Sequence, residues 1–327
     1  MDNLFRKMRF DQQTIVAVLF VAIFGTFAIW LPAFSSLGNL LTLVRSVSVL
    51  GILALGMAIV VIGRGIDLSM IATLAVPAAV VLTLVSAGYR PEVALLIGVL
   101  FAALVGAVNG FLVAYAEIPA LFTTLAVGIG LAGVGQSGLF EYEIIPWPPG
   151  LDVIAWIGRG TIFGVPYSIL AFILAALVVH IFLQKTRLGL FIYAIGDNLA
   201  AARNAGIATR PIIVLQYVLA AVIALFAGMV LSASNSSMDT RIFNLTWIYD
   251  VILVVVLGGI GLSGGRGGVM NVIVGTLLIG TIVNGMTILN VSFETQKLIK
   301  GLVLLAALLT DSVLNPRNEE TEKQGDI

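Results

Sequence analysis

The chain has 327 residues, of which 60% are hydrophobic and 10% are charged, and its mean hydropathy is +1.11. Soluble domains are nearer half apolar and a quarter charged, so lipid must solvate much of this chain. The formal net charge of zero argues against a nucleic-acid partner, and the lack of cysteine together with a single histidine, His180, excludes disulfides, thiolate metal sites and multi-histidine metal sites.

Apolar runs of about 20 residues predict an all-α polytopic membrane protein with about ten transmembrane helices, because backbone amides in hydrocarbon must be satisfied within the helix. The first run follows Arg6, Lys7 and Arg9 but has no small-x-small cleavage site, so we interpret it as a retained helix and not a signal peptide. The predicted spans are 14–31, 40–62, 68–86, 93–115, 121–140, 165–184, 211–232, 247–262, 269–290 and 295–313.

The distribution of basic residues predicts that both chain ends lie in the cytoplasm. With that orientation, eleven of the 17 Lys and Arg residues fall on the inner side and six on the outer side. The expected organisation is a cytoplasmic N-terminus (1–13), one transmembrane permease domain (14–314) and a disordered, acidic cytoplasmic tail (315–327). In the long outer segment, an amphipathic piece from Asp152 to Ile157 either lies along the membrane surface or simply connects two spans.

Glycine interrupts the apolar runs at two similar places, which predicts two broken helices. Residues 60–69 and 255–263 both contain Gly-Ile-x-Leu-Ser after a β-branched run, and Val-Asn-Gly recurs at 108–110 and 283–285. Interruptions of this kind in two halves of a chain are typical of transporters built from structural repeats. The spacing between the paired motifs differs in the two halves, so the predicted repeat is imperfect.

Few polar residues within the apolar runs are candidates for a substrate pathway: Asp67, Ser69, Asn109 and Asn284. A carboxylate flanked by apolar runs must face protein or water, and Asp67 could either cap the following helix or contact a substrate. The two asparagines could form interhelical hydrogen bonds or line a pathway. No cluster of His, Asp, Glu or Ser shares a common depth, so we expect no catalytic residues, no metal and no enzyme activity.

Leu262-Ser263-Gly264-Gly265 matches the start of the signature sequence of ATP-binding-cassette (ABC) ATPases, but it lies between two predicted spans. A phosphate-binding P-loop requires Gly-Lys-Ser/Thr, and no lysine in this chain follows a glycine. We therefore expect the chain itself to bind neither ATP nor another cofactor.

The predicted cytoplasmic loop, 185–210, contains a short alanine-rich helix from Leu199 to Asn204. Asn198 can cap its start and Gly206 can end it. A short helix with small side chains outside the membrane suits docking into a groove on a partner, although an ordinary loop helix would have the same pattern.

Several short motifs follow one another between residues 40 and 313, and the most informative lie in the predicted cytoplasmic loop. They are Thr186-Arg187-Leu188-Gly189, Gly196-x-Asn198-x-x-Ala201-Ala202-Arg203-x-x-Gly206-Ile207, Gly65-Ile66-Asp67-Leu68-Ser69, Gly106-x-x-Asn109-Gly110, Ile118-Pro119, Thr124-Leu125, Val256-Leu257-Gly258-Gly259 and Ser263-Gly264-Gly265-Arg266-Gly267. With these motifs in this order, the chain resembles the membrane permeases of the ribose/xylose/arabinose type of ABC sugar importers. It departs from the family at Met70-Ile71, where Val-Gly is usual, at Ile248, where an acidic residue is usual, and at Arg64, where glycine is common.

The resemblance implies a multi-pass subunit of the bacterial inner membrane that imports a monosaccharide or polyol by alternating access. It implies a second permease subunit, identical or similar, two cytoplasmic ABC ATPases that carry ATP and Mg²⁺, and a periplasmic sugar-binding protein. The residues that would couple transport to the ATPase are Gly196, Asn198, Ala201, Ala202, Arg203 and Gly206.

Two other transporter classes remain as alternatives. A branched-chain amino acid ABC permease would share the general layout. An ion-coupled secondary transporter would need embedded ionisable groups, for which Asp67, Asp250 and Asp311 are the candidates.

Overall fold

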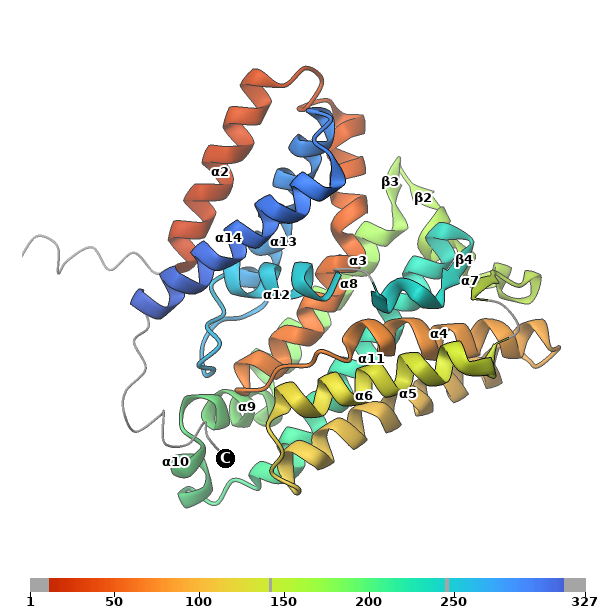
Figure 1. The fold of residues 1–327 in the computed structure, drawn as a ribbon, viewed down its shortest axis with the longest axis vertical. Helices are drawn as coiled ribbons and strands as arrows, with labels where there is room; N and C mark the ends of the chain where they lie inside the picture. Colours follow the sequence, from red (N-terminus) through yellow and green to blue (C-terminus); the bar gives the residue numbers. More distant parts are fainter. Residues whose placement is uncertain (1–11, 141–142, 245–246, 315–327) are drawn as a thin grey trace, which may run out of the picture.

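The structure is a computed structural model that describes residues 12–140, 143–244 and 247–314 (Figure 1). These residues form thirteen α-helices and four short strands, so the chain is an all-α membrane protein. The helices are α2 (Gln12–Trp30), α3 (Leu37–Ile62), α4 (Met70–Ser86), α5 (Pro91–Ala114), α6 (Ala120–Val134), α7 (Asp152–Arg159), α8 (Tyr167–Lys185), α9 (Arg187–Asp197), α10 (Leu199–Asn204), α11 (Thr209–Asn235), α12 (Trp247–Leu257), α13 (Val269–Ile288) and α14 (Phe293–Leu314).

Each of the ten predicted spans coincides with one helix of the structure. In the described part of the chain, six helices are long and apolar enough to cross a membrane: α3, α5, α6 with the turn after it, α8, α11 and α13. Helices α2, α4 and α12 are apolar but shorter. The predicted span 247–262 is too long, because α12 ends at Leu257, just before Gly258 and Gly259. The predicted N-terminal segment 1–13 and tail 315–327 lie almost wholly outside the described residues.

Helix α11 lies at the centre of the bundle, against α3, α4 and α5. Small residues allow the backbones to approach closely: a Cβ atom added at Gly106 of α5 would lie 2.5 Å from the carbonyl oxygen of Tyr217. Further along α11, a Cβ at Gly228 would collide with the carbonyl oxygen of Leu74 in α4. Because lipid is as apolar as the side chains, such close van der Waals packing is a main source of helix association in a membrane.

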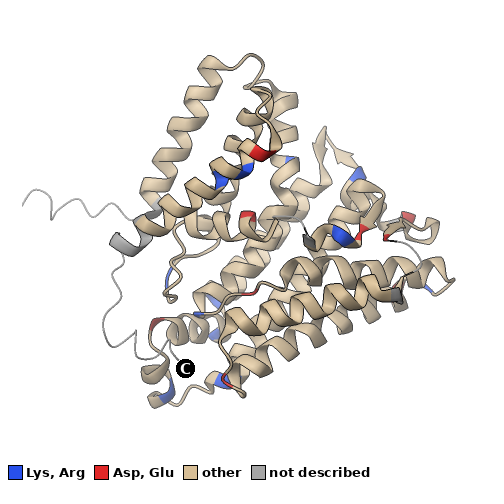
Figure 2. Cartoon of the chain, viewed as in Figure 1, with Lys and Arg blue, Asp and Glu red and all other residues tan. Residues whose placement is uncertain are grey.

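The two ends of the bundle carry different extramembrane structures. Helices α9 and α10 lie at the end where α3, α5 and α8 terminate, whereas α7 and the four strands lie at the opposite end (Figure 1). Lys, Arg, Asp and Glu gather mainly at helix ends and connections, and α4 and α6 contain none (Figure 2). This distribution is typical of helices whose central parts face lipid or one another.

The predicted amphipathic piece forms α7, which packs on the protein. Nε of Arg159 donates a hydrogen bond to the carbonyl oxygen of Ala233 in α11 at 2.8 Å, and Gly158 is in close contact with Ser234. The helix is therefore held against the end of α11, in a segment that connects α6 to α8.

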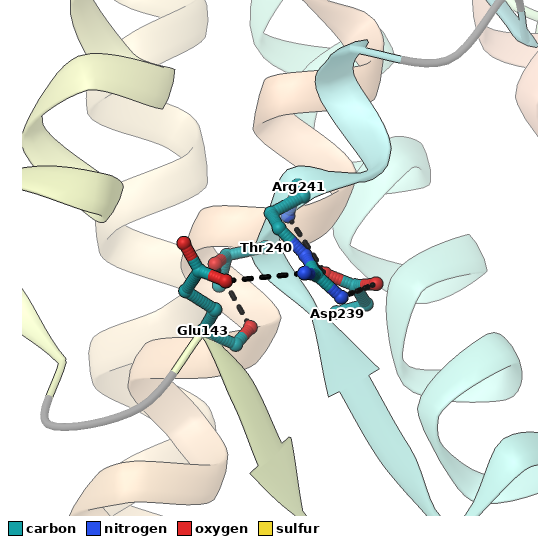
Figure 3. A network of polar contacts seen from close by, with 4 residues as sticks. All are labelled: Glu143, Asp239, Thr240 and Arg241. Carbon is teal, nitrogen blue, oxygen red and sulfur yellow. Dashed lines mark hydrogen bonds and ion pairs between the residues drawn. The ribbon is translucent and has the colours of Figure 1, made fainter.

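Two short antiparallel pairs join segments at this end of the molecule: β1 (Ile144–Pro146) with β4 (Ser237–Asp239), and β2 (Thr161–Ile162) with β3 (Val165–Pro166). Beside β1 and β4, the guanidinium of Arg241 lies 3.2 Å from Glu143 and 3.0 Å from Asp239 (Figure 3). The hydrogen bond from Arg241 holds the pKa of the Asp239 carboxyl below its usual value. This network ties the segment after α6 to the segment after α11.

Candidate functional site

The break after α3 begins with a left-handed turn. The amide of Gly65 donates to the carbonyl oxygen of Val60 at 2.9 Å, the amide of Arg64 donates to that of Val61 at 2.9 Å, and Arg64 has a φ of 70°. This is the Schellman arrangement, in which a helix ends on one left-handed residue that is usually glycine.

The break after α12 ends in the same way. Ile260 donates to Val255 at 3.1 Å, Gly259 donates to Val256 at 3.0 Å, and Gly259 has a φ of 89°. The two breaks therefore share one backbone geometry, with Arg64 at the place that Gly259 holds in the second. The structure pairs Arg64 with Gly259, whereas the Gly-Ile-x-Leu-Ser match in the sequence pairs Gly65 with Gly259. The two pairings are therefore offset by one residue.

Three of the four predicted pathway residues meet in a buried cluster at the first break. Oδ1 of Asp67 accepts hydrogen bonds from the backbone amide of Ser69 at 2.9 Å and from its hydroxyl at 2.5 Å. Nδ2 of Asn109, in α5, donates to the same hydroxyl at 2.8 Å. All three residues are at most 1% exposed. Asp67 does not cap α4: Ser69 occupies the N-cap position, no side chain caps the helix, and the backbone amide that Asp67 accepts is that of Ser69 itself.

Two further residues brace this break, and sequence reasoning did not single them out for it. Oγ1 of Thr124 in α6 accepts from the amide of Leu68 at 3.0 Å, and the hydroxyl of Tyr217 in α11 donates to the carbonyl oxygen of Ile66 at 3.4 Å. Thr124 belongs to one of the family motifs, and Tyr217 follows a glutamine inside an otherwise apolar run, so both positions carried a signal.

The fourth predicted pathway residue, Asn284, lies elsewhere. Its amide and that of Asn39 exchange two hydrogen bonds at 3.0 and 3.1 Å, which tie α13 to the start of α3. The 23 residues between Asn39 and the end of α3 place this pair roughly 35 Å from the break. Asn109 and Asn284 therefore belong to different helix contacts, although both sit in a Val-Asn-Gly sequence.

The structure contains the predicted loop helix as α10, with the predicted boundaries. Oδ1 of Asn198 accepts the amide of Ala201 at 2.9 Å, which caps the start of the helix. Gly206, with a φ of 80°, ends it. Helix α9 is capped in the same way by Thr186, whose hydroxyl accepts the amide of Gly189 at 3.0 Å.

The six predicted coupling residues divide into two groups on the α9–α10 segment (residues 187–206). Gly196 and Ala202 are buried against the bundle, and the other four are exposed: Asn198, Ala201, Arg203 and Gly206. The exposed group gives α10 a surface that a partner could contact.

The α9–α10 segment rests directly on both helix breaks. Gly196 packs so closely on the end of α3 that an added Cβ would collide with the carbonyl oxygen of Ile62, which also accepts the amide of Gly265 at 2.8 Å. The hydroxyl of Tyr193 donates to the carbonyl oxygen of Gly267 at 2.8 Å. Burial raises the pKa of this hydroxyl, so it remains a neutral donor. A displacement of α9 would therefore change the contacts at the break after α3 and in the glycine-rich segment after α12.

In the described ranges, no group of three or more His, Cys, Asp or Glu residues could hold a metal ion. The buried polar cluster at the first break consists of the carboxyl of Asp67, the hydroxyl of Ser69 and the amide of Asn109, which contact one another. Short contacts join the surface helix to two interrupted helices in the bundle, so these elements are mechanically coupled.

These features define a multi-pass membrane transport subunit. Residues 39–308 match the family described as the permease component of branched-chain amino acid transport systems, and the chain belongs to this family. It is 33% identical to the ribose import permease protein of Escherichia coli (strain K12) over 304 residues, 92% of this chain and 94% of that protein. It is 33% identical to the ribose import permease protein of Bacillus subtilis (strain 168), over 86% of each chain.

A further relative is the L-arabinose ABC transporter permease protein of Azospirillum brasilense, with 32% identity over 90% of this chain and 86% of that protein. These relatives confirm the resemblance to sugar-importer permeases, and they are transport components, not catalysts. No solved structure matches the chain.

Proposed function

We propose that this chain is the membrane permease subunit of an ATP-driven importer that carries a monosaccharide, pentose-like in size, or a polyol across the inner membrane by alternating access. The named relatives transport ribose and L-arabinose, which supports a sugar as substrate. The observation that carries the mechanism is the contact of the α9–α10 segment with both helix breaks through Gly196, Ile62 and Gly265.

In this proposal α10 is the coupling helix and residues 185–210 form the cytoplasmic coupling loop. Asn198, Ala201, Arg203 and Gly206 contact the ATPase, and Gly196 and Ala202 transmit its movement to the bundle. Residues 14–314 form one permease domain with about ten crossing helices and an imperfect internal repeat. Both chain ends (1–13 and 315–327) lie in the cytoplasm. The shared geometry of the two breaks supports the repeat.

The partners in this proposal are a second permease subunit, two cytoplasmic ABC ATPases that bind ATP and Mg²⁺, and a periplasmic sugar-binding protein. The membership of an import-permease family supports these partners. The strand pairs and α7 would then face the periplasm, where the binding protein docks.

Our candidates for the substrate pathway remain Asp67, Ser69 and Asn109. In this proposal they shape the pathway by holding the break between α3 and α4 in place. Their near-complete burial supports this structural role, because a side chain in direct contact with a passing sugar needs a surface on the pathway. Asn284 would contribute by holding α13 against α3.

The alternatives are a branched-chain amino acid permease, which the printed family description mentions, and an ion-coupled transporter. The sugar-importing relatives favour the main proposal over the first. Against the second, Asp67 is hydrogen-bonded and 1% exposed, and Asp250 is paired with Lys300 at 2.7 Å.

The test is uptake into proteoliposomes that contain this chain with its cognate ATPase, with the binding protein supplied outside. Uptake of a pentose that requires both ATP and the binding protein is the expected result. Uptake of leucine under the same conditions would favour the amino acid alternative, and uptake by this chain alone that stops when an ion gradient is removed would refute the proposal.

A further inference from the structure

The β2–β3 hairpin carries a fully exposed phenylalanine at its tip. Ile162 pairs with Val165, so Phe163 and Gly164 form a two-residue loop between the strands. The side chain of Phe163 is 100% exposed, the highest value among the large hydrophobic residues in the described part of the chain. Exposure of a single apolar side chain is common and by itself indicates no partner. The backbone, the neighbouring helix and the distribution of charge around the hairpin indicate one.

The backbone of the loop disfavours phenylalanine. Phe163 has a φ of 50° and Gly164 a φ of 81°, as a type I′ hairpin loop requires. Asparagine or glycine adopts the first of these positions readily, whereas a bulky side chain there is strained. Strain of this kind persists where the side chain has a use, so the use of the aromatic ring accounts for a phenylalanine at this position.

The hairpin leads directly into a helix with the length and composition of a membrane span. Helix α8 begins at Tyr167, immediately after β3. Between residues 167 and 178, the exposed side chains of α8 lie on one face and are all large and apolar: Leu170, Ile173, Leu174, Leu177 and Val178. Helix contacts in a membrane favour small residues, so such a face is typical of contact with lipid. The start of α8 and the hairpin therefore lie at a membrane interface, at the end of the bundle opposite α9 and α10 (Figure 1).

Aromatic residues beside the hairpin match that position. The rings of Trp156 in α7 and Tyr167 in α8 pack edge to face, with their centroids 5.0 Å apart. Trp156 is 52% exposed. Trp and Tyr gather where a membrane meets water, because each ring combines an apolar body with one polar atom. The pair therefore indicates the level of the interface next to the hairpin.

Charge separates the hairpin from the other extramembrane structure at this end of the bundle. No Asp, Glu, Lys or Arg occurs between residues 160 and 184. By contrast, Glu143, Asp239 and Arg241 form the exposed network beside β1 and β4. A soluble protein partner would be steered to that charged network. The uncharged hairpin suits lipid, because a charged segment enters the apolar part of a bilayer only at a high cost.

We propose that the β2–β3 hairpin is a membrane anchor, whose tip inserts the ring of Phe163 into the adjoining leaflet of the bilayer. Ile162, which is 40% exposed, enters beside it, and Trp156 lies at the level of the headgroups. Removal of this apolar surface from water drives the insertion. The anchor fixes the start of α8 and, through the contact of Trp156 with Tyr167, holds α7 at the membrane surface. This inference does not rest on the proposed function and holds for either orientation of the chain.

The test uses the full chain reconstituted in phosphatidylcholine liposomes. The chain has no cysteine, so Phe163→Cys creates a unique site for a nitroxide spin label. Power saturation of the label compares its collisions with oxygen, which concentrates in hydrocarbon, and with a nickel chelate, which stays in water. We expect an excess of oxygen collisions at position 163. The same label at Ile173→Cys, on the exposed face of α8, gives the value for lipid, and at Asn204→Cys, exposed on α10, the value for water.

A second set of variants tests whether the ring drives the insertion. A label at Ile162→Cys reports on the tip while position 163 is varied. Phe163→Asn removes the ring and keeps a residue that tolerates the left-handed conformation. It should shift the label at position 162 from the lipid value toward the water value. Phe163→Leu is the matched control, because it keeps a large apolar side chain and should leave the label in lipid.

Three results would count against the anchor. Collisions at position 163 that are dominated by nickel would overturn the proposal and leave the tip available to a soluble partner. A label shielded from both reagents would overturn it as well, because a second copy of the chain would then cover the tip. If Phe163→Asn leaves the label at position 162 in lipid, the ring does not drive the insertion and the proposal fails. Because none of these measurements involves transport, such a failure would leave the importer function standing.

Discussion

Replacing Gly196 with alanine should separate ATP hydrolysis from transport. The new Cβ would collide with the carbonyl oxygen of Ile62 and lie 2.5 Å from the amide nitrogen of Gly265. An ordinary contact of this kind is at least 3.4 Å, and the contact with Ile62 is shorter still than that with Gly265, so α9 must move away from the helix breaks by more than about 1 Å. Overpacking of this size costs about 1–3 kcal/mol, which is enough to change the occupancy of the docked state at least fivefold.

The assay compares sugar uptake with ATP hydrolysis in proteoliposomes that hold the complete importer. We expect the number of sugar molecules imported per ATP to fall at least fivefold, while the amount of chain in the membrane stays unchanged. Gly130→Ala is the matched control, because it adds the same methyl group to α6 with no atom within 4 Å. An unchanged ratio of uptake to hydrolysis in Gly196→Ala would refute the reasoning that links α9 to the breaks.

Three further predictions concern pairs and clusters outside this contact. Lys300→Ala should lower stability by about 3–5 kcal/mol in an unfolding titration, because it leaves the Asp250 carboxylate without its partner at a site where both side chains are under 20% exposed. Ser69→Ala should cost about 1–3 kcal/mol in the same titration, because it removes the hydroxyl that joins the buried cluster at the first break. The hydrogen bond from Arg241 lowers the pKa of the Asp239 carboxyl in the folded chain. The stability that this pair contributes is therefore present above the unfolded pKa of about 3.9 and is lost as the pH falls through the folded pKa. Amide hydrogen exchange near β4, corrected for intrinsic rates, should accelerate below about pH 4, and Asp239→Asn should abolish this acceleration.

Each of these predictions has an outcome that contradicts it. A Lys300→Ala variant as stable as the wild type would show that the ion pair contributes little. For Ser69→Ala, the exposed Ser137→Ala is the control, and equal stability of the two variants would count against the cluster. An acid-induced step that survives in Asp239→Asn must have another origin.

The helices and their local ends could be predicted from the amino-acid sequence. Each of the ten apolar runs contains a helix of the structure, and six of the described helices are long and apolar enough to cross a membrane. A helix satisfies its own backbone groups, so this requirement acts along the chain without long-range partners. The short helix α10 could be predicted with its ends, because Asn198 and Gly206 act on residues within one turn. The two breaks could be predicted for the same reason, because glycine interrupts a helix at the position that it occupies.

Which of these helices and breaks contact one another could not be predicted from the sequence and is known from the packing of the folded chain. Helices that are apolar on every side carry little periodicity to show which face contacts which neighbour, so Asn109 and Asn284 looked alike in the sequence. The structure places one on Ser69 and the other on Asn39. It also decided that Gly196 rests on the end of α3, because this contact depends on a close approach between segments far apart in the chain.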